Sequence, residues 1–167
     1  AKLILKQYKI RITAFVSQIG NVTASVNYKK TSSGMIEKDI LRCPDTKASG
    51  MMKKMLVNLQ KKGDTIGGAI FCYIKGCPAG LGEPVFDKLQ SDLAKAMLSI
   101  PAAKGFEYGE GFEAASMKGS EHNDGFEMHN NIVRPSGNHA GGILGGISTG
   151  EDITFRVAFK PVSSISI

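Results

Sequence analysis

The chain has 167 residues, 42% of them hydrophobic and 22% charged, and its formal net charge is +6 at pH 7. This length and composition predict one globular domain with a sizeable core. No apolar run approaches the length of a membrane-spanning helix, so we expect no membrane partner. The first residues lack the order of a signal peptide, so we expect a cytoplasmic protein.

The basic net charge would suit binding to nucleic acid. Four lysines, however, lie on the polar side of one predicted helix: Lys53, Lys54, Lys61 and Lys62. The chain also has no Trp and no alternation of aromatic and basic residues typical of an RNA-binding sheet. We therefore interpret these lysines as a solvated helix face and expect no nucleic-acid partner.

The three cysteines are Cys43, Cys72 and Cys77. Their spacing matches neither a zinc site nor a disulfide framework. We expect them to be reduced and mostly buried.

The first part of the chain predicts a helix, a strand, an extended segment and a second helix. Residues 2–8 have the pattern of the end of a helix, and residues 9–20 alternate apolar and polar side chains at strand period. Residues 36–42 are expected to be a short extension. Residues 44–46 then offer a helix start, and apolar side chains recur at helical spacing until Gly63.

The rest of the chain predicts further strands around one more helix. Residues 65–74 are almost continuously apolar, which is typical of a strand covered on both faces. Pro84 is expected to open a helix that runs to residue 98 with a buried apolar stripe. Residues 102–108 and 152–159 predict two strands, while residues 124–137 have no periodicity and predict a mobile surface loop. Strands separated by single amphipathic helices favour a two-layer arrangement, with helices on one face of a sheet.

The run from Gly137 to Gly150 is rich in glycine and predicts backbone built for close approach. The strand predicted at residues 152–159 follows it. One cation and two hydroxyls follow directly after that strand, at Lys160, Ser163 and Ser164. This is the chemistry of a site for an anion or a phosphate-bearing cofactor.

Known phosphate motifs do not explain this run. It has no Gly-Lys-Ser/Thr ending of a P-loop, and residues 105–111 do not give the dinucleotide fingerprint. On the residues alone, tight turns are the better explanation.

The order of several motifs resembles the chorismate synthase family. These motifs are Gly63-Asp64, residues 77–84, residues 99–102, residues 119–124, the glycine run and Lys160-Pro161. The family's Gly-Glu-Ser-His-Gly stretch, its Arg/Ser/Ala/Gly-rich segment and its Arg-His-Asp-Pro stretch do not occur here. The chain is therefore expected to be the central part of a chorismate synthase protomer, with residues 1–167 as a single domain.

The resemblance also implies a fold and an activity. The implied fold is α+β or α/β in two to three layers, with amphipathic helices packed on antiparallel sheet, in a homotetramer. The implied reaction is a 1,4-anti elimination of phosphate from 5-enolpyruvylshikimate-3-phosphate that gives chorismate, with reduced FMN that is not consumed. Since the family's catalytic histidines lie in the missing stretches, no catalytic residue is assigned and the chain alone is expected to be inactive. The alternative is a non-catalytic binding or assembly module whose glycine loops serve packing.

The resemblance implies eight FMN contacts in this chain. They are Pro101, Ala102, Gly145, Lys160, Pro161, Val162, Ser163 and Ser164. At Gly145 a small residue would let the backbone lie close to the flavin, and Lys160 would supply positive charge for the reduced flavin or its phosphate. Val162 replaces the threonine common in the family, so one hydroxyl is absent.

The histidines at positions 122, 129 and 139 invite metal or acid–base proposals. A zinc site would need further ligands at suitable spacing, and none is apparent, so no metal is expected. Structural hydrogen bonding is the interpretation for His122 and His139. We interpret residues 121–124 as a tight turn in which the Asn and Asp side chains hydrogen-bond to their own backbone.

Overall fold

The structure, a computed structural model, describes residues 1–129, 132–163 and 165. Its elements in chain order are α1 (Lys2–Gln7), β1 (Arg11–Ile19), β2 (Val22–Thr23), the 3-10 turn η1 (Tyr28–Lys30), α2 (Ser33–Glu37), α3 (Thr46–Lys61), β3 (Gly68–Lys75), α4 (Leu89–Leu98), β4 (Ala103–Tyr108), the 3-10 turn η2 (Gly111–Ser116), α5 (Gly119–His122), β5 (Phe126–His129), β6 (Ile132–Pro135), β7 (Ile143–Leu144), β8 (Ile147–Ser148) and β9 (Ile153–Phe159). Among the helices so described, none has both the length and the apolarity needed to cross a membrane.

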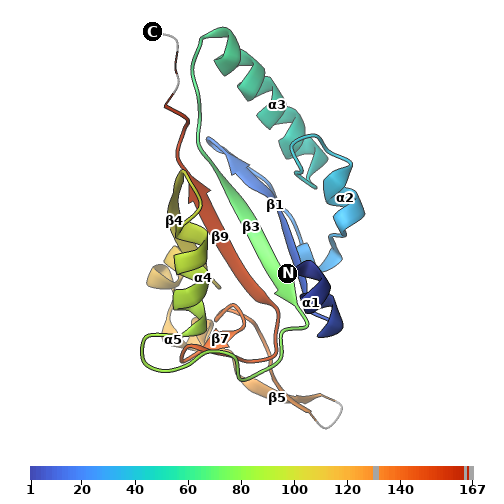
Figure 1. Cartoon of the computed structure of the whole chain (residues 1–167), viewed down its shortest axis with the longest axis vertical. Coiled ribbons are helices and arrows are strands. Elements are labelled where there is room, and N and C mark those ends of the chain that lie inside the picture. Colours follow the sequence, from blue (N-terminus) through green and yellow to red (C-terminus); the bar gives the residue numbers. More distant parts are fainter. Residues whose placement is uncertain (130–131, 164, 166–167) are drawn as a thin grey trace. The chain divides into compact units, whose positions relative to one another are not determined.

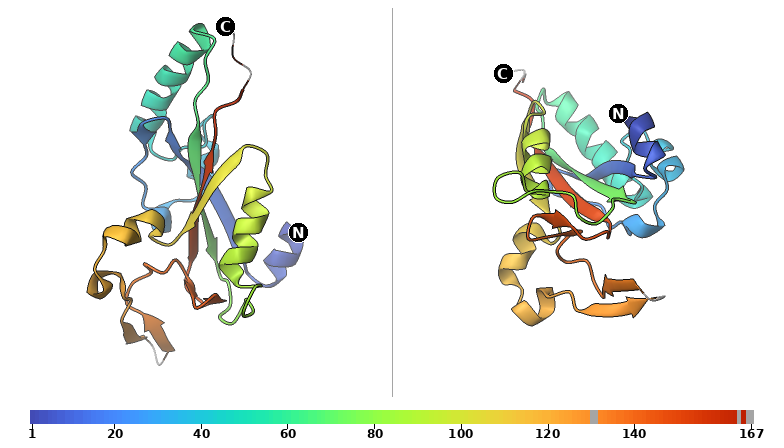
Figure 2. Two further views of the ribbon diagram at one scale, coloured as in Figure 1. Left: turned by 90° about the vertical axis from the view of Figure 1, so that its left-hand side faces the viewer. Right: turned by 60° about the horizontal axis from the view of Figure 1, so that its bottom comes forward.

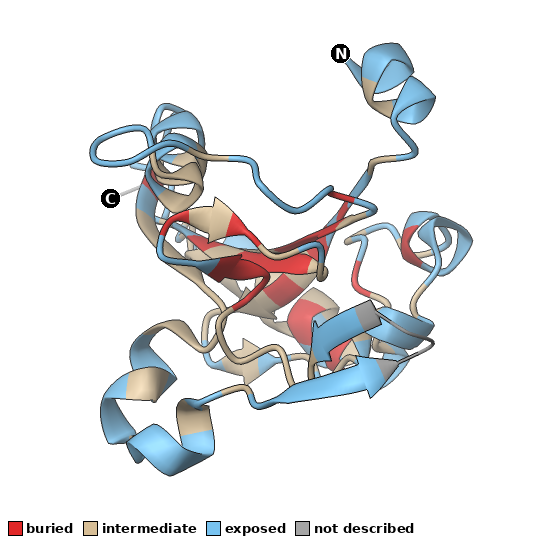
Figure 3. Ribbon diagram, turned by 90° about the horizontal axis from the view of Figure 1, so that it is seen from below, coloured by how far each residue is buried: buried red, intermediate tan, exposed pale blue. Residues whose placement is uncertain are grey.

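One five-stranded sheet has the order β2-β1-β3-β9-β4 (Figure 1). Strands β3 and β9 have neighbours on both sides, which fits their apolar sequences. The buried residues concentrate along β1, β3 and β9 (Figure 3). Two antiparallel hairpins, β5–β6 and β7–β8, stand outside this sheet. The predicted combination of amphipathic helices and antiparallel strands is confirmed.

The chain forms two compact units. Unit 1 comprises Ala1–Ile12, Tyr73–Met97 and Phe106–Phe155, and unit 2 comprises Thr13–Cys72, Leu98–Gly105 and Arg156–Ile167. The sequence predicted a single domain, and no shift in composition marks a second unit.

Helix α3 carries the core of unit 2. Its first turn is capped by Asp45, whose carboxylate accepts the N–H groups of Lys47 and Ala48, each at 3.0 Å. These bonds, with one from the Ser25 N–H, lower the pKa of Asp45 although burial opposes them. Met52, one turn further along, is fully buried with Cys43 and Ala48. The helix predicted after Pro44 is therefore confirmed.

The extension predicted at residues 36–42 is wrong. Helix α2 occupies its first residues, and the Ser32 hydroxyl caps it by accepting the Met35 N–H at 3.3 Å. The Asp39 carboxylate then accepts the Leu41 N–H at 2.9 Å, which closes a turn. Local side-chain bonds to the backbone thus replace the extended conformation.

The helix predicted from Pro84 begins later, at Leu89. The preceding residues form a turn in which the Glu83 N–H donates to the Asp87 carbonyl at 2.8 Å. The Leu89 N–H donates to the Gly146 carbonyl at 2.8 Å, so a distant segment fixes the helix start. The stripe predicted as buried is not, because α4 has no buried residue and Phe86 is 88% exposed.

The segment at residues 124–137, expected to be a loop, contains the hairpin β5–β6 (Figure 2). Phe126 pairs with Pro135, and Met128 pairs with Val133. Of the large apolar side chains here whose burial is described, Phe126, Met128 and Val133, each is exposed. Where the side chains of a strand pair are exposed, as these three are, burial imposes no alternation of apolar and polar residues, so the sequence has no strand signal. The mobility expected of this segment stays a prediction.

Candidate functional site

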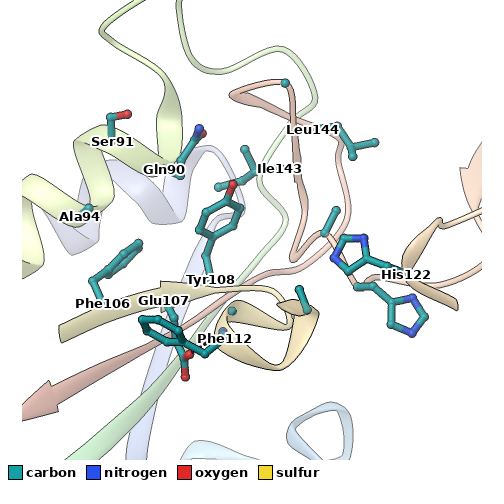
Figure 4. A pocket seen from close by; sticks show the side chains of 15 residues that line it. Gln90, Ser91, Ala94, Phe106, Glu107, Tyr108, Phe112, His122, Ile143 and Leu144 are labelled. Atoms are coloured by element: carbon teal, nitrogen blue, oxygen red, sulfur yellow. Dashed lines mark hydrogen bonds between the residues drawn. The ribbon is translucent and has the colours of Figure 1, made fainter. Parts of the chain in front are cut away.

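A cavity of about 640 Å³ lies within unit 1, a size typical of small-molecule sites (Figure 4). Helix α4 contributes one side through Gln90, Ser91 and Ala94. Strand β4 contributes Phe106, Glu107 and Tyr108. The remaining lining residues belong to η2, α5 and the glycine run.

Aromatic rings form one wall of the cavity. Phe106 and Tyr108 project from β4 toward helix α4 (Figure 4), and the Phe106 ring lies 5.5 Å from the buried Phe155 ring between centroids. The Phe112 N–H donates to the Glu107 carboxylate at 3.1 Å, which fastens this acid to the backbone. A Cβ at Gly111, where φ is +55°, would strike the Glu107 side chain. The wall formed by Phe106 and Tyr108 is therefore apolar, while the Glu107 side chain points to the other face of β4 (Figure 4).

The glycine run contributes the turn of the hairpin β7–β8. Gly145 and Gly146 connect the two strands, with φ angles of +59° and +98°. Positive φ at both central residues is the requirement of a type I′ turn, so hairpin geometry accounts for this glycine pair. At Gly145 an added Cβ would also meet open space, whereas at Gly146 it would strike Lys88. Gly145 thus presents bare backbone to the cavity that it lines.

A hydrogen bond to a carboxylate holds the histidine of the glycine run. Nδ1 of His139 lies 2.7 Å from Oδ1 of Asp124, whose side chain is 5% exposed. Oδ2 of the same carboxylate accepts the Ala140 N–H at 3.2 Å. Burial acts to raise the pKa of Asp124, but the bonds from His139 and Ala140 outweigh it and leave this pKa below its ordinary value. His139 thus makes the structural hydrogen bond that its sequence context predicted.

The second imidazole lies nearby. The ring centroids of His122 and His139 are 6.1 Å apart, and both residues line the cavity. The side chain of His129 is outside the described part of the structure. Within residues 1–129, 132–163 and 165, no three His, Cys, Asp or Glu side chains are grouped to hold a metal ion. The three cysteines are free and buried, and burial raises the pKa of Cys72 to about 12.

A separate turn in unit 2 gathers most of the predicted FMN contacts. The Lys160 N–H donates to the Ala102 carbonyl at 3.0 Å, and Ala102 has a φ of +68°, which is uncommon for a residue other than glycine. The Thr65 hydroxyl donates to the Val162 carbonyl at 2.6 Å. Five of the predicted contacts are exposed here: Pro101, Lys160, Pro161, Val162 and Ser163. Ser164 lies outside the described residues.

A family model described as chorismate synthase matches residues 1–167. The chain belongs to the chorismate synthase family. It is 52% identical over 165 residues to the chorismate synthase of Phocaeicola vulgatus, in an alignment that covers 99% of this chain and 46% of that relative. It is also 52% identical over 167 residues to the chorismate synthase of Methanosarcina mazei, again covering 99% of this chain and 46% of the relative.

The fold agrees with this membership. A solved crystal structure of chorismate synthase matches with a TM-score of 0.83 and 31% sequence identity, over 96% of this chain and 52% of that chain. The resemblance that the motifs indicated is therefore confirmed. The chain spans about half the length of the curated relatives it matches.

The motifs in the sequence did not indicate the aromatic wall of the cavity. A signal was present, because Phe106 and Tyr108 are two residues apart on a predicted strand and so share one face. Gln90 and Ala94, four residues apart, share one face of the predicted helix in the same way. The sequence did not show that this face of the strand and this face of the helix line the same cavity.

Proposed function

We propose that the complete protein is a chorismate synthase that removes phosphate from 5-enolpyruvylshikimate-3-phosphate by 1,4-anti elimination, with reduced FMN, and gives chorismate. The observation that carries this proposal is the family match over residues 1–167. Because the chain spans about half of its relatives, the activity is proposed for the complete protein, and residues 1–167 alone are expected to give no turnover. As the resemblance implies, we propose a cytoplasmic homotetramer.

Two places in the chain suit FMN. At Gly145 the backbone is bare and a Cβ would stand in open space, so a planar ring could lie against it. At the Ala102–Lys160 turn, the exposed Lys160 offers a cation and the exposed Ser163 offers a hydroxyl to a phosphate. Reduced flavin, when bound, supplies the electron density that stabilises charge as phosphate leaves.

The neighbouring residues hold the Ala102–Lys160 turn in place. The Val162 carbonyl accepts the Thr65 hydroxyl, so this residue contributes through its backbone although it lacks the usual family hydroxyl. A Cβ at Gly67 would lie 2.6 Å from the Phe159 carbonyl, so a glycine is needed where this strand end passes. The exposed side chains of Lys160 and Ser163 are therefore presented from a fixed backbone, as an anion site requires.

The non-catalytic alternative also has an observation in its favour. Several glycines are explained by packing, since a Cβ at Gly82 would strike the Gly146 carbonyl and one at Gly109 would strike the His139 carbonyl. The hairpin turn explains Gly145 as well, so the family match over residues 1–167 is what favours the catalytic proposal.

An anaerobic assay for chorismate absorbance tests the proposal. The complete protein, supplied with reduced FMN and 5-enolpyruvylshikimate-3-phosphate, should form chorismate, and residues 1–167 should form none. Absence of chorismate with the complete protein would contradict the proposed activity. Turnover by residues 1–167 would instead contradict the division of binding and catalytic residues between this chain and the rest of the protein.

A further inference from the structure

A short segment, residues 78–82, is bonded to strand β8 through Ser148. The Ser148 hydroxyl donates to the Pro78 carbonyl at 2.6 Å and accepts the Leu81 N–H at 2.9 Å. The Ser148 backbone N–H donates to the Leu81 carbonyl at 2.9 Å, and the Gly80 N–H donates to the Ser148 carbonyl at 2.9 Å. Ser148 is buried, with 3% of its surface exposed. We call residues 78–82 the strap, because these hydrogen bonds hold it against the hairpin β7–β8.

The far end of the strap meets the turn of this hairpin and the start of helix α4. The Leu89 N–H, at the first residue of α4, donates to the Gly146 carbonyl at 2.8 Å. Gly82 lies against this bond, since an added Cβ would strike the Gly146 carbonyl and would lie 3.0 Å from the Leu89 nitrogen. Its φ of +117° also disfavours any other residue. Glycine at position 82 is therefore what allows the strap, the turn and the helix to meet.

The hydrogen bond between Leu89 and Gly146 joins two walls of the cavity in unit 1. Gly145, which precedes Gly146, lines the cavity from the turn. Gln90, which follows Leu89, lines it from helix α4 (Figure 4). The strap thus fixes the spacing between the bare backbone at Gly145 and this face of the helix.

Gly82 and Ser148 act on the cavity from behind its lining. Both belong to the described part of the chain, and neither is among the residues that line the cavity. The motif at residues 77–84, on which the family resemblance partly rests, includes Gly82 but none of the eight residues expected to contact FMN. The expected FMN contacts therefore give this motif no role.

We propose that Gly82 and Ser148 are positioning residues for the flavin ring, because they hold the Gly145 turn where the ring lies against it. The proposal rests on the proposed function, which puts FMN at Gly145, and adds two residues that do not touch the cofactor. Dispersion attraction falls steeply with distance, so a shift of about 0.5 to 1 Å in the turn forfeits roughly a quarter to a half of its contact energy with a planar ring. The strap holds the turn before the ring arrives, which reduces the entropy lost on binding.

Gly82→Ala and Gly80→Ala are matched variants for the test. Both glycines have a positive φ, +117° and +98°, so alanine strains the backbone at either position. A Cβ at Gly80 meets open space, whereas one at Gly82 displaces Gly146. FMN is titrated against the complete protein and followed by flavin fluorescence, and Gly82→Ala should bind it about tenfold more weakly than Gly80→Ala. The visible absorption spectrum of bound FMN should change in Gly82→Ala only.

Two buried serines provide a second comparison, which applies even if Gly82→Ala does not fold. Ser148→Ala removes the hydroxyl that bonds to the strap. Ser49→Ala removes a similarly buried hydroxyl, 1% exposed, that donates to Asp39 at 2.8 Å in unit 2. Urea denaturation should show a loss of stability in both variants. Only Ser148→Ala should weaken FMN binding, by about threefold to tenfold, and alter the spectrum of bound FMN, which a purely structural role would leave unchanged.

The outcomes separate this inference from the proposed function. If the unmodified protein binds FMN, and neither Gly82→Ala nor Ser148→Ala binds it more weakly than its control, the inference is overturned and the proposed function stands. If the unmodified protein binds no FMN, both are overturned.

Discussion

Met52 provides a quantitative test of the core of unit 2. Its side chain is 0% exposed and packs with Cys43 and Ala48 under helix α3. Met52→Ala removes every side-chain atom beyond Cβ and leaves a cavity, which should lower the free energy of unfolding by about 2 to 5 kcal/mol. For a chain of this size the corresponding fall in Tm is roughly 4 to 20 °C.

The neighbouring Met51 is the matched control, because it is 46% exposed on the same helix. Met51→Ala makes the same chemical change and should alter the free energy of unfolding by less than about 1 kcal/mol. Urea denaturation followed by circular dichroism measures both variants. Equal losses in the two variants would refute the burial of Met52 and the orientation of α3 on which it rests.

Two further predictions concern polar groups. The hydrogen bond from Lys53, aided by bonds from the Ser49 hydroxyl and the Leu41 N–H against the effect of burial, lowers the pKa of Asp39 to about 2. Because folding lowers the pKa of Asp39, its contribution to stability is complete above the unfolded pKa of about 4 and is lost as pH falls toward 2. Asp39→Asn should therefore flatten the dependence of the free energy of unfolding on pH between these limits. An unchanged dependence would count against the hydrogen bond between Lys53 and Asp39. In the described structure Oε1 of Gln90 is buried without a hydrogen-bond partner. Gln90→Met should therefore leave the free energy of unfolding, measured by urea denaturation, unchanged or raise it by up to about 2 kcal/mol. A clear fall in this free energy would show that the oxygen is hydrogen-bonded.

The sequence predicted those elements whose signals are local. Asp45 follows Pro44 and caps the helix that the next residues form, so a short stretch contained the whole signal for α3. The apolar run of β3 likewise reflects its place inside the sheet. The start of α4 was missed because the Leu89 N–H bonds to Gly146, which is distant in sequence. The hairpin β5–β6 was missed because Phe126, Met128 and Val133 are exposed, so burial imposes no pattern on these positions.

In the candidate site, too, motifs in the sequence located some residues, whereas contacts between distant residues could not be predicted. The motifs led to Lys160 and Ala102, and the structure joins them through a backbone hydrogen bond. Gly145 was singled out as a residue where backbone is bare, and it lines the cavity. The pairing of His139 with Asp124 could not be read from the sequence, because the two residues are 15 positions apart and meet only through the fold of the glycine run.

Titration of FMN against the complete protein tests whether this chain carries flavin-binding residues of a chorismate synthase. Lys160→Ala removes the exposed cation beside Ala102 and should weaken FMN binding by about 1 to 3 kcal/mol, the range for a charge-assisted hydrogen bond. Lys62→Ala, which removes the same charge at the exposed end of α3, should leave the affinity unchanged. Equal FMN affinities in the unmodified protein and both variants would contradict the claim.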